Sequence, residues 1–325
     1  TANIRIMLES IEVFEHFAEE MDQEIDFRQY GYLFLTTEPQ TWADFQANVA
    51  LQRSLGVPVE LLSREEIAER FPYLHVDDVI GGTFCPRDGY ADPYSVNMGF
   101  AKQARRLGAL IYENTPATGI QVVGGKVVAV ETPQGTISTP VVVNTAGAWA
   151  AEIGRMVGVE LPVQPYRRQV FVTAPFHKLP KEVPLVIDFE PSFYFRREGV
   201  SILMGMSDKD EPPSFNTNVD WSFLERVAER AMHRCPVLEE AGFHDGWAGL
   251  YAITPDDNAI IGRDVGGVEG FVCAVGFSGH GFQQSRAVGR ILAELILDGE
   301  TSFDIHEFRL ERFTEGQLAG EKRVV

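Results

Sequence analysis

Apolar side chains near the start of the chain recur at helical spacing. Ile4, Leu8, Ile11 and Phe14 fall on one side of a helical wheel, and most of the intervening glutamates fall elsewhere. A stripe of this kind is typical of an amphipathic helix that packs on a core. The pattern predicts one helix over residues 1–21, with no β-strand before it in the sequence.

The residues after this helix alternate strand-like and helix-like patterns. Ser63 and Glu66 have the spacing of a capping box, in which each side chain accepts a hydrogen bond from the other residue's backbone N–H. Asp92-Pro93 is a helix start and Gly108 a helix stop, since proline suits the first helical position and glycine the position after the last. The predicted elements are a strand over 31–36 and helices over 42–55, from Ser63 to about Phe71, and from Asp92 to Leu107.

From Ala109 the pattern changes to short runs rich in β-forming residues. Gly124-Gly125 separates two alternating runs and therefore predicts a hairpin turn. The apolar run 141–143 indicates a strand buried on both faces that leads into a turn and a helix, and Asp220 is expected to cap a helix ending at His233. The predicted strands are 109–112, 117–123, 126–132, 136–138 and 141–143, followed by 166–173, 192–195 and 200–206.

The last part of the chain carries the most specific pattern. An apolar run at 271–275 ends in a loop with Gly276, Gly279 and Gly281, and a long helix with an apolar stripe follows to about Gly299. Glycines at such a place allow backbone N–H groups to converge on an electron-rich ligand at a helix N-terminus.

Length and composition are those of a globular protein with a sizeable core. The chain has 325 residues, of which 45% are hydrophobic, enough for one large or two ordinary domains. Its 28 basic and 47 acidic residues give a formal charge of −19, which disfavours nucleic acid and anionic membrane surfaces as partners. An anionic substrate would need a local basic or N–H-rich pocket.

The three cysteines, Cys85, Cys235 and Cys273, lie far apart and have no CxxC spacing. This usage fits a reducing compartment and argues against a disulfide framework or a zinc site. No apolar run approaches the length of a bilayer-spanning helix. A cytoplasmic protein without a membrane span or a metal site is therefore predicted.

Several sequence blocks together resemble the D-amino-acid oxidase-like superfamily of FAD enzymes. They are DGYADPYSV, the block from ATGI to VVVNTAGAWA, LPVQPYRRQVFVT, LMGMSD, WAGLYAITPDDNAIIG and GFSGHGFQQ, in this order. The resemblance covers nearly the whole chain. It is strongest to the branch that contains sarcosine oxidase, dimethylglycine dehydrogenase and the proline dehydrogenase β-subunit.

The resemblance implies a mixed α/β fold in which a Rossmann-like FAD-binding domain is interleaved with a substrate domain built on a large antiparallel sheet. The implied ranges are 1–30, 75–165 and 245–325 for the FAD-binding domain and 31–74 and 166–244 for the substrate-binding domain. The opening strand and GxGxxG turn of the family, which hold the FAD phosphates, have no counterpart in this sequence. The chain is therefore expected to start about one βα unit late. A noncatalytic chain that is truncated or completed by a partner, and binds no FAD alone, is an alternative.

The resemblance also implies which residues contact a noncovalently bound FAD. The loop from Gly276 to Gln283 would present N–H groups to the pyrimidine edge of the flavin, where negative charge accumulates on reduction. Gly249 stands near a position where some sarcosine oxidases attach the flavin through a cysteine. The implied cofactor-binding residues are Ala117, Ala146, Gly147, Trp149, Gly249, Leu250, Gly276, Phe277, Ser278, Gly279, His280, Gly281, Phe282 and Gln283.

For the substrate, the resemblance implies a carboxylate site. Tyr251 matches a tyrosine that contacts the substrate carboxylate in relatives, although a tyrosine packed in the core is an alternative. Gln283 stands where monomeric sarcosine oxidases have a carboxylate-binding lysine, which leaves this position uncharged. Tyr194, on the strand predicted at 192–195, is the third candidate.

The implied reaction is oxidation of the C–N bond of a secondary or tertiary amino acid, such as sarcosine, dimethylglycine or proline, by hydride transfer to the flavin. Leu203 and Ser207 stand where oxygen-using relatives have a lysine and often a histidine. A dehydrogenase that passes electrons to a protein or partner subunit is therefore favoured, with an oxygen-using oxidase as the alternative. A serine hydrolase is disfavoured, because GFSGH has His280 where GxSxG requires glycine.

Overall fold

The computed structural model describes residues 2–318, and its largest element is an eight-stranded sheet in the order β12-β8-β11-β10-β9-β1-β3-β2. Neighbouring strands are antiparallel except β1 and β9, which are parallel. The strands are β1 Tyr32–Thr36, β2 Glu60–Ser63, β3 Gly81–Cys85, β8 Gln164–Thr173, β9 Leu185–Asp188, β10 Phe193–Glu198, β11 Ser201–Met206 and β12 Phe243–Ile253.

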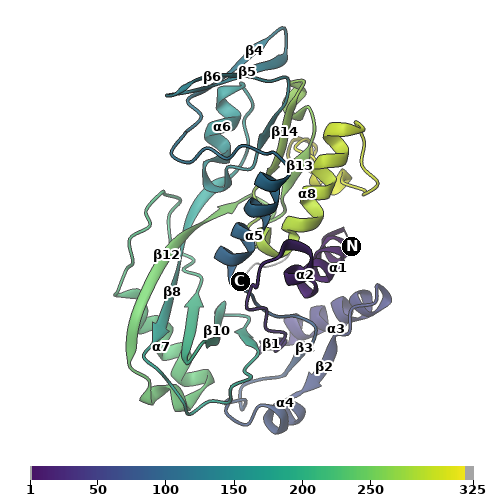
Figure 1. Cartoon of the computed structure of the whole chain (residues 1–325). Helices are drawn as coiled ribbons and strands as arrows, with labels where there is room; N and C mark the ends of the chain where they lie inside the picture. The colour runs from purple at the N-terminus through teal and green to yellow at the C-terminus, as the bar shows by residue number, and fades with distance from the viewer. Residues whose placement is uncertain (1, 319–325) are drawn as a thin grey trace.

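Two three-stranded sheets form the opposite end of the molecule (Figure 1). In the first, β14 lies between β13 and β7, and it pairs with β7 in parallel. The second is the meander β4-β5-β6, with its first turn at Gly124-Gly125 as predicted. Their bounds are β4 Gly119–Val123, β5 Lys126–Thr132, β6 Gly135–Ser138, β7 Val142–Asn144, β13 Ile260–Gly262 and β14 Phe271–Val275.

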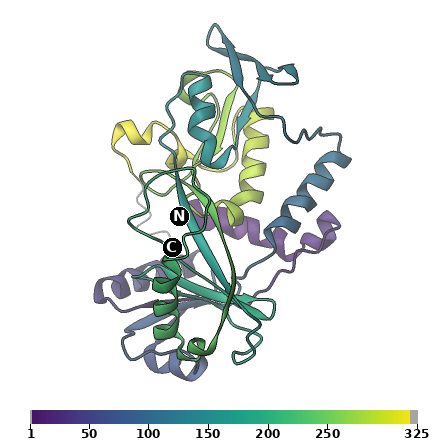
Figure 2. The ribbon, with the colours of Figure 1, turned by 90° about the vertical axis from the view of Figure 1, so that its left-hand side faces the viewer.

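Helices connect and cover these sheets. Figures 1 and 2 show α1, α2 and α5 lying between the large sheet and the two small ones. None of the helices within residues 2–318 is long and apolar enough to cross a bilayer. The helices are α1 Ala2–Glu15, α2 Phe17–Met21, α3 Pro39–Ser54, α4 Arg64–Arg70, α5 Pro93–Arg106, α6 Ala150–Met156, α7 Phe223–Arg234, α8 Gly281–Leu297 and α9 Arg312–Glu315, with 3-10 turns at Gly147–Trp149, Pro236–Glu240, Val265–Gly267 and His306–Phe308.

One face of the large sheet carries the main hydrophobic core. Side chains alternate between the two faces of a strand, and Phe171, Phe193, Phe195 and Met204 are buried on the face that packs on Val227 of α7. The other face points toward the small sheets. It carries Arg168, Tyr194 and Tyr251 among aliphatic side chains such as Val170 and Leu203, and it forms part of the site described below.

Local helix signals were confirmed. The Ser63 hydroxyl accepts from the Glu66 N–H at 3.2 Å and the Glu66 carboxylate accepts from the Ser63 N–H at 2.8 Å, which closes the capping box of α4. Asp92 caps α5 through the N–H groups of Tyr94 and Ser95. The three cysteines are buried free thiols, in line with their spacing.

The prediction of one continuous helix over 1–21 is wrong, because α1 ends at Glu15 and α2 begins at Phe17. The break lets neighbouring aromatic residues face different helices. Phe14 stacks on Phe282 of α8 with ring centroids 5.3 Å apart, whereas Phe17 meets the ring of Phe100 on α5 edge-on at 5.1 Å. These distant contacts override the continuous apolar stripe.

Three smaller predictions also need correction. Residues 109–112 form no strand, and Leu110 is 77% exposed. The strand over 141–143 is not buried on both faces: β7 is at the edge of its sheet, and Val143 is 39% exposed. Asp220 is not the helix cap. It accepts from the Ser222 N–H at 3.0 Å in the turn before α7, which begins at Phe223.

The large sheet draws strands from ranges predicted to belong to the other domain. β3 and most of β12 fall in the ranges 75–165 and 245–325, yet both pair within the eight-stranded sheet. The mixed α/β class is confirmed. The assignment of ranges to an FAD-binding and a substrate-binding domain stays a prediction.

Candidate functional site

Two loops meet at the carboxyl ends of the parallel strands β7 and β14. Asn144 at the end of β7 is in register with Cys273 of β14, so the turn from Ala146 and the loop from Gly276 start side by side. In open α/β sheets, ligands bind in the crevice outside the carboxyl ends of the strands. The two glycine-containing segments singled out from the sequence are therefore brought together.

The loop after β14 can adopt its conformation only with glycine at key positions. Gly276 and Gly279 have φ of +71° and +99°, and Ser278 has φ of +50°. A Cβ on Gly276 would lie 2.4 Å from Cγ2 of Thr254. The loop is also tied to the end of β12, since the Ser278 N–H donates to Ala252 at 2.9 Å and the Ser278 hydroxyl accepts from the Thr254 N–H at 3.2 Å. The N–H of Ser278 is thus engaged within the protein.

The loop delivers the chain into the N-terminus of α8. In any α-helix the first N–H groups have no intrahelical acceptor and carry partial positive charge. Within residues 2–318, no side chain caps α8. The N–H groups of Gly281, Phe282 and Gln283 are thus at the uncapped end of a 17-residue helix. This arrangement fits an electron-rich ligand edge.

A chain of polar contacts fixes this helix end. The Asn3 side chain of α1 donates to the Asn258 side chain at 2.8 Å, and the Gln284 side chain donates to Asn3 at 3.2 Å. Gln284 is 2% exposed. The N-terminal helix, the turn after β12 and α8 are thereby held in one arrangement.

A pocket of about 210 Å³ lies beside the end of β7. Ala117 and Ala146, both predicted to contact the cofactor, line it together with Asn144 and Ile153. Gly147 follows with φ of +53°. Trp149 lies outside this lining, where its ring stacks on Phe215 at 5.4 Å.

The face of the large sheet turned toward these loops carries an arginine among tyrosines. The strand registers place Arg168, Tyr194, Tyr251 and Tyr32 on this common face. The guanidinium carbon of Arg168 lies 5.4 Å from the ring centroid of Tyr251. Gly205 leaves room for Tyr194, because a Cβ there would lie 2.5 Å from the phenol oxygen.

Arg168 has no carboxylate partner among the described residues. Its Nε is buried without a hydrogen-bond partner, and its Nη1 donates to the backbone oxygen of Arg167 at 3.0 Å. The adjacent Arg167, by contrast, pairs with Glu211 at 2.8 Å. A buried unpaired donor is costly, so this guanidinium is suited to receive an external anion.

The tyrosines around Arg168 supply neutral donors. Burial raises the pKa of Tyr251 and of Tyr194 above the ordinary value, so both hydroxyls keep their protons at neutral pH. Burial likewise raises the pKa of Asp257, which the charges of His280 and Arg168 partly oppose. One cation flanked by neutral phenols can bind a carboxylate.

The predicted residues fall into separate parts of this site. Tyr251, Tyr194 and Gly249 share the sheet face with Arg168, whereas Leu250 lies on the opposite face. The predicted loop and helix-start residues, which include Phe277, His280 and Gln283, lie at the N-terminus of α8. Sequence reasoning missed Arg168, which the pairing of β8 with β12 places near Tyr251, and Tyr32, which lies on the same face of the sheet on β1.

Asp88 gives this region a pH dependence that can be measured. Burial raises its pKa to about 6, from 3.8 for an ordinary aspartate. The folded state then holds the proton more tightly than the unfolded state, so stability is lost as the pH rises from about 4 through 6. Between pH 4 and pH 7, the free energy of unfolding in urea should fall by on the order of 1–2 kcal/mol more for the wild type than for Asp88→Asn. A difference independent of pH would contradict this assignment.

The comparisons with known proteins agree on one family. A family model described as DAO, FAD dependent oxidoreductase, matches residues 1–295. Mitochondrial dimethylglycine dehydrogenase of Homo sapiens is 33% identical over an alignment 328 residues long, which covers 95% of this chain and 38% of that protein. Mitochondrial sarcosine dehydrogenase of Homo sapiens is 32% identical, over 88% of this chain and 32% of that protein. The chain thus spans less than two fifths of the length of these relatives.

Solved structures show the same likeness. L-proline dehydrogenase from P. horikoshii superposes with a TM-score of 0.90 at 34% identity, covering 97% of this chain and 84% of that one. Glycine oxidase from Geobacillus kaustophilus gives a TM-score of 0.85 at 26% identity, covering 96% of this chain and 84% of that one.

Proposed function

Because the chain belongs to the DAO family of FAD-dependent oxidoreductases, whose model matches residues 1–295, we propose that it oxidises the C–N bond of a secondary or tertiary amino acid. Sarcosine, dimethylglycine and proline are the substrates to test, because the names of the similar proteins include them. FAD is the cofactor of this family. We favour a dehydrogenase over an oxygen-using oxidase.

The observation that carries the proposal is the unpaired guanidinium of Arg168. Its buried Nε lacks an acceptor, and Tyr251 and Tyr194 lie on the same sheet face with protonated hydroxyls. A carboxylate bound here would gain charge-assisted hydrogen bonds. Arg168 would bind the carboxylate and the two tyrosines would orient it, which holds the amine end toward the α8 loop.

The residues at the other side of the crevice fit FAD. The N–H groups at the start of α8 would hold the electron-rich edge of the flavin, and the pocket lined by Ala117 and Ala146 would accept the adenine end. When bound, the flavin supplies the two-electron oxidation of the amine. The protein contributes position and a fixed electrostatic environment. We propose that the binding is noncovalent.

The preference for a dehydrogenase rests on the sheet face above the crevice. Leu203 is 5% exposed and shares that face with Arg196, its cross-strand neighbour. Leu203 itself offers no charge to stabilise reduced oxygen, and the guanidinium of Arg196 beside it is paired with Glu198 at 2.6 Å. We therefore propose an electron-accepting protein or partner subunit as the oxidant, in a protein predicted to be cytoplasmic.

The decisive experiment is spectroscopic and kinetic. The purified chain is mixed with FAD, desalted and scanned for flavin absorbance, and then assayed with sarcosine, dimethylglycine and proline. We expect retained flavin and turnover with an artificial electron acceptor that exceeds turnover with oxygen. Absence of retained flavin would support the noncatalytic alternative, and equal turnover with oxygen would favour an oxidase.

A further inference from the structure

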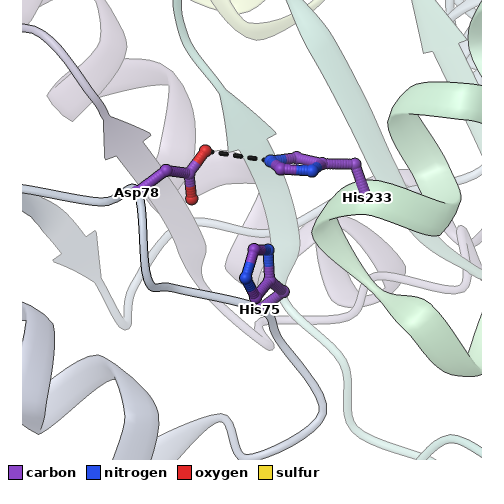
Figure 3. A group of neighbouring side chains, drawn as sticks. All are labelled: His75, Asp78 and His233. Atoms are coloured by element: carbon purple, nitrogen blue, oxygen red, sulfur yellow. Dashed lines mark hydrogen bonds and ion pairs between the residues drawn. The ribbon is translucent and has the colours of Figure 1, made fainter.

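Three polar side chains converge at the surface where the loop before β3 meets the end of α7. They are His75, Asp78 and His233, and one ligand atom of each lies within 4.8 Å of the others. Figure 3 shows the two imidazole rings and the carboxylate directed at the same space. Nε2 of His233 is 2.9 Å from Oδ2 of Asp78. His233 belongs to α7, which covers the core face of the large sheet, so the cluster lies away from the face with Arg168.

A buried arginine holds the carboxylate in place. Arg234 has no exposed surface, and its Nη1 and Nη2 donate to the two oxygens of Asp78 at 2.9 Å and 3.1 Å. The same guanidinium pairs with Asp188 at 3.1 Å. Carboxylate ligands of metal ions are commonly oriented by such a second hydrogen-bonding partner. Asp78 is therefore fixed before any ion binds.

Backbone contacts fix the loop to the helix. The N–H of His75 donates to the backbone oxygen of Arg234 at 2.9 Å, and Arg234 also donates to the backbone oxygen of His75. The rings of His75 and His233 are edge-to-face with centroids 5.0 Å apart. The three ligand atoms lie within 4.8 Å of one another, and the imidazole side chains would rotate to place them about 2.0–2.2 Å from one ion.

Charge and exposure also suit a cation. Two carboxylates, Asp78 and Asp188, share the single guanidinium of Arg234, and Asp77 lies 3.5 Å from Nε2 of His75, so acidic groups outnumber the arginine around the cluster. The side chains of His75, Asp78 and His233 are 35%, 36% and 39% exposed. An ion can thus enter from solvent and keep water in its remaining positions.

We propose that His75, Asp78 and His233 bind one divalent transition-metal ion of the Zn²⁺ type, which joins the loop before β3 to α7. Two imidazoles and one carboxylate select such ions over Mg²⁺, which prefers oxygen ligands and keeps its waters. The site is independent of the flavin crevice. A finding that no ion binds here would therefore not contradict the proposed oxidation of amino acids.

Calorimetric titration of the full chain, stripped with a chelator and dialysed, tests the proposal. One equivalent of Zn²⁺ should bind per chain. The same titration with MgCl₂ should show no binding. His75→Gln and His233→Gln should each weaken Zn²⁺ binding by at least about 10-fold. Loss of a residue that only hydrogen-bonds to a metal ligand already weakens binding by roughly 10- to 100-fold. The matched control is His244→Gln, at an exposed histidine of β12, which should bind like the wild type.

A second measurement separates ion binding from misfolding. Without metal, urea unfolding of the wild type and of the His75→Gln/His233→Gln double variant should agree closely, because both side chains are exposed. Saturating Zn²⁺ should raise the unfolding midpoint of the wild type only. Equal Zn²⁺ binding by the wild type and the double variant, or no binding by either, would overturn the proposal.

Discussion

Replacement of Arg168 by methionine should lower kcat/KM for an amino-acid substrate by about 100-fold, or about 3 kcal/mol, since this is the usual cost of removing one partner of a buried charged pair. The guanidinium has no carboxylate partner within residues 2–318, so a substrate carboxylate would be its ionic partner. The kcat/KM of Arg168→Lys should lie between those of the wild type and of Arg168→Met, because lysine keeps the positive charge but lacks the planar guanidinium that binds a carboxylate with two hydrogen bonds.

Comparing substrates with and without a carboxylate isolates this role of Arg168. An N-methylated amine without a carboxylate should be turned over equally by the wild type and by Arg168→Met. Arg230→Met, at an exposed position of α7, is the matched control for loss of an arginine. Equal losses with both kinds of substrate, at unchanged flavin absorbance, would show that Arg168 supports the fold and does not bind the carboxylate.

Replacement of Arg312 by methionine should lower the free energy of unfolding by about 3–5 kcal/mol, because it leaves Asp256 as a buried unpaired charge. Both side chains are 1% exposed, and Nε and Nη2 of Arg312 donate to the two carboxylate oxygens at 2.8 Å and 2.9 Å. Burial alone would raise the pKa of Asp256, yet its bonds to Arg312 hold the pKa below the ordinary value.

Urea unfolding near neutral pH measures this loss. Lys126→Met is the control for an exposed ion pair, since Lys126 and Glu269 are 60% and 57% exposed, and it should change stability by less than about 1 kcal/mol. The double variant Arg312→Met/Asp256→Asn should recover much of the lost free energy of unfolding, because asparagine removes the buried unpaired negative charge of Asp256. A single variant as stable as Lys126→Met would contradict the assigned role.

Features encoded by neighbouring residues were predictable from the sequence. The capping box of α4, the Asp92 cap and the Gly124-Gly125 hairpin depend on a few adjacent side chains and backbone angles, and all three were confirmed. The glycine loop before α8 was located for the same reason: positive φ values at Gly276 and Gly279 are a local requirement.

Features that depend on distant contacts were not predictable. The break after Glu15 results from aromatic contacts with α5 and α8, and the exposure of Val143 results from the position of β7 in its sheet. Arg168 adjoins Tyr251 only because β8 pairs with β12. The cluster of His75, Asp78 and His233 was missed for the same reason, since 155 residues separate Asp78 from His233.

The interleaved topology has a consequence for how the chain is made. β1 pairs with β9, which follows much later in the chain, and α1 rests on α8, where the N–H of Ala287 donates to Ser10 at 3.2 Å. β1 cannot complete its pairing before β9 has been synthesised, and α1 cannot pack before α8, which ends at Leu297, has been synthesised. High contact order of this kind slows folding and leaves apolar surface exposed during synthesis. Yield of native protein should therefore depend on translation rate and chaperone supply.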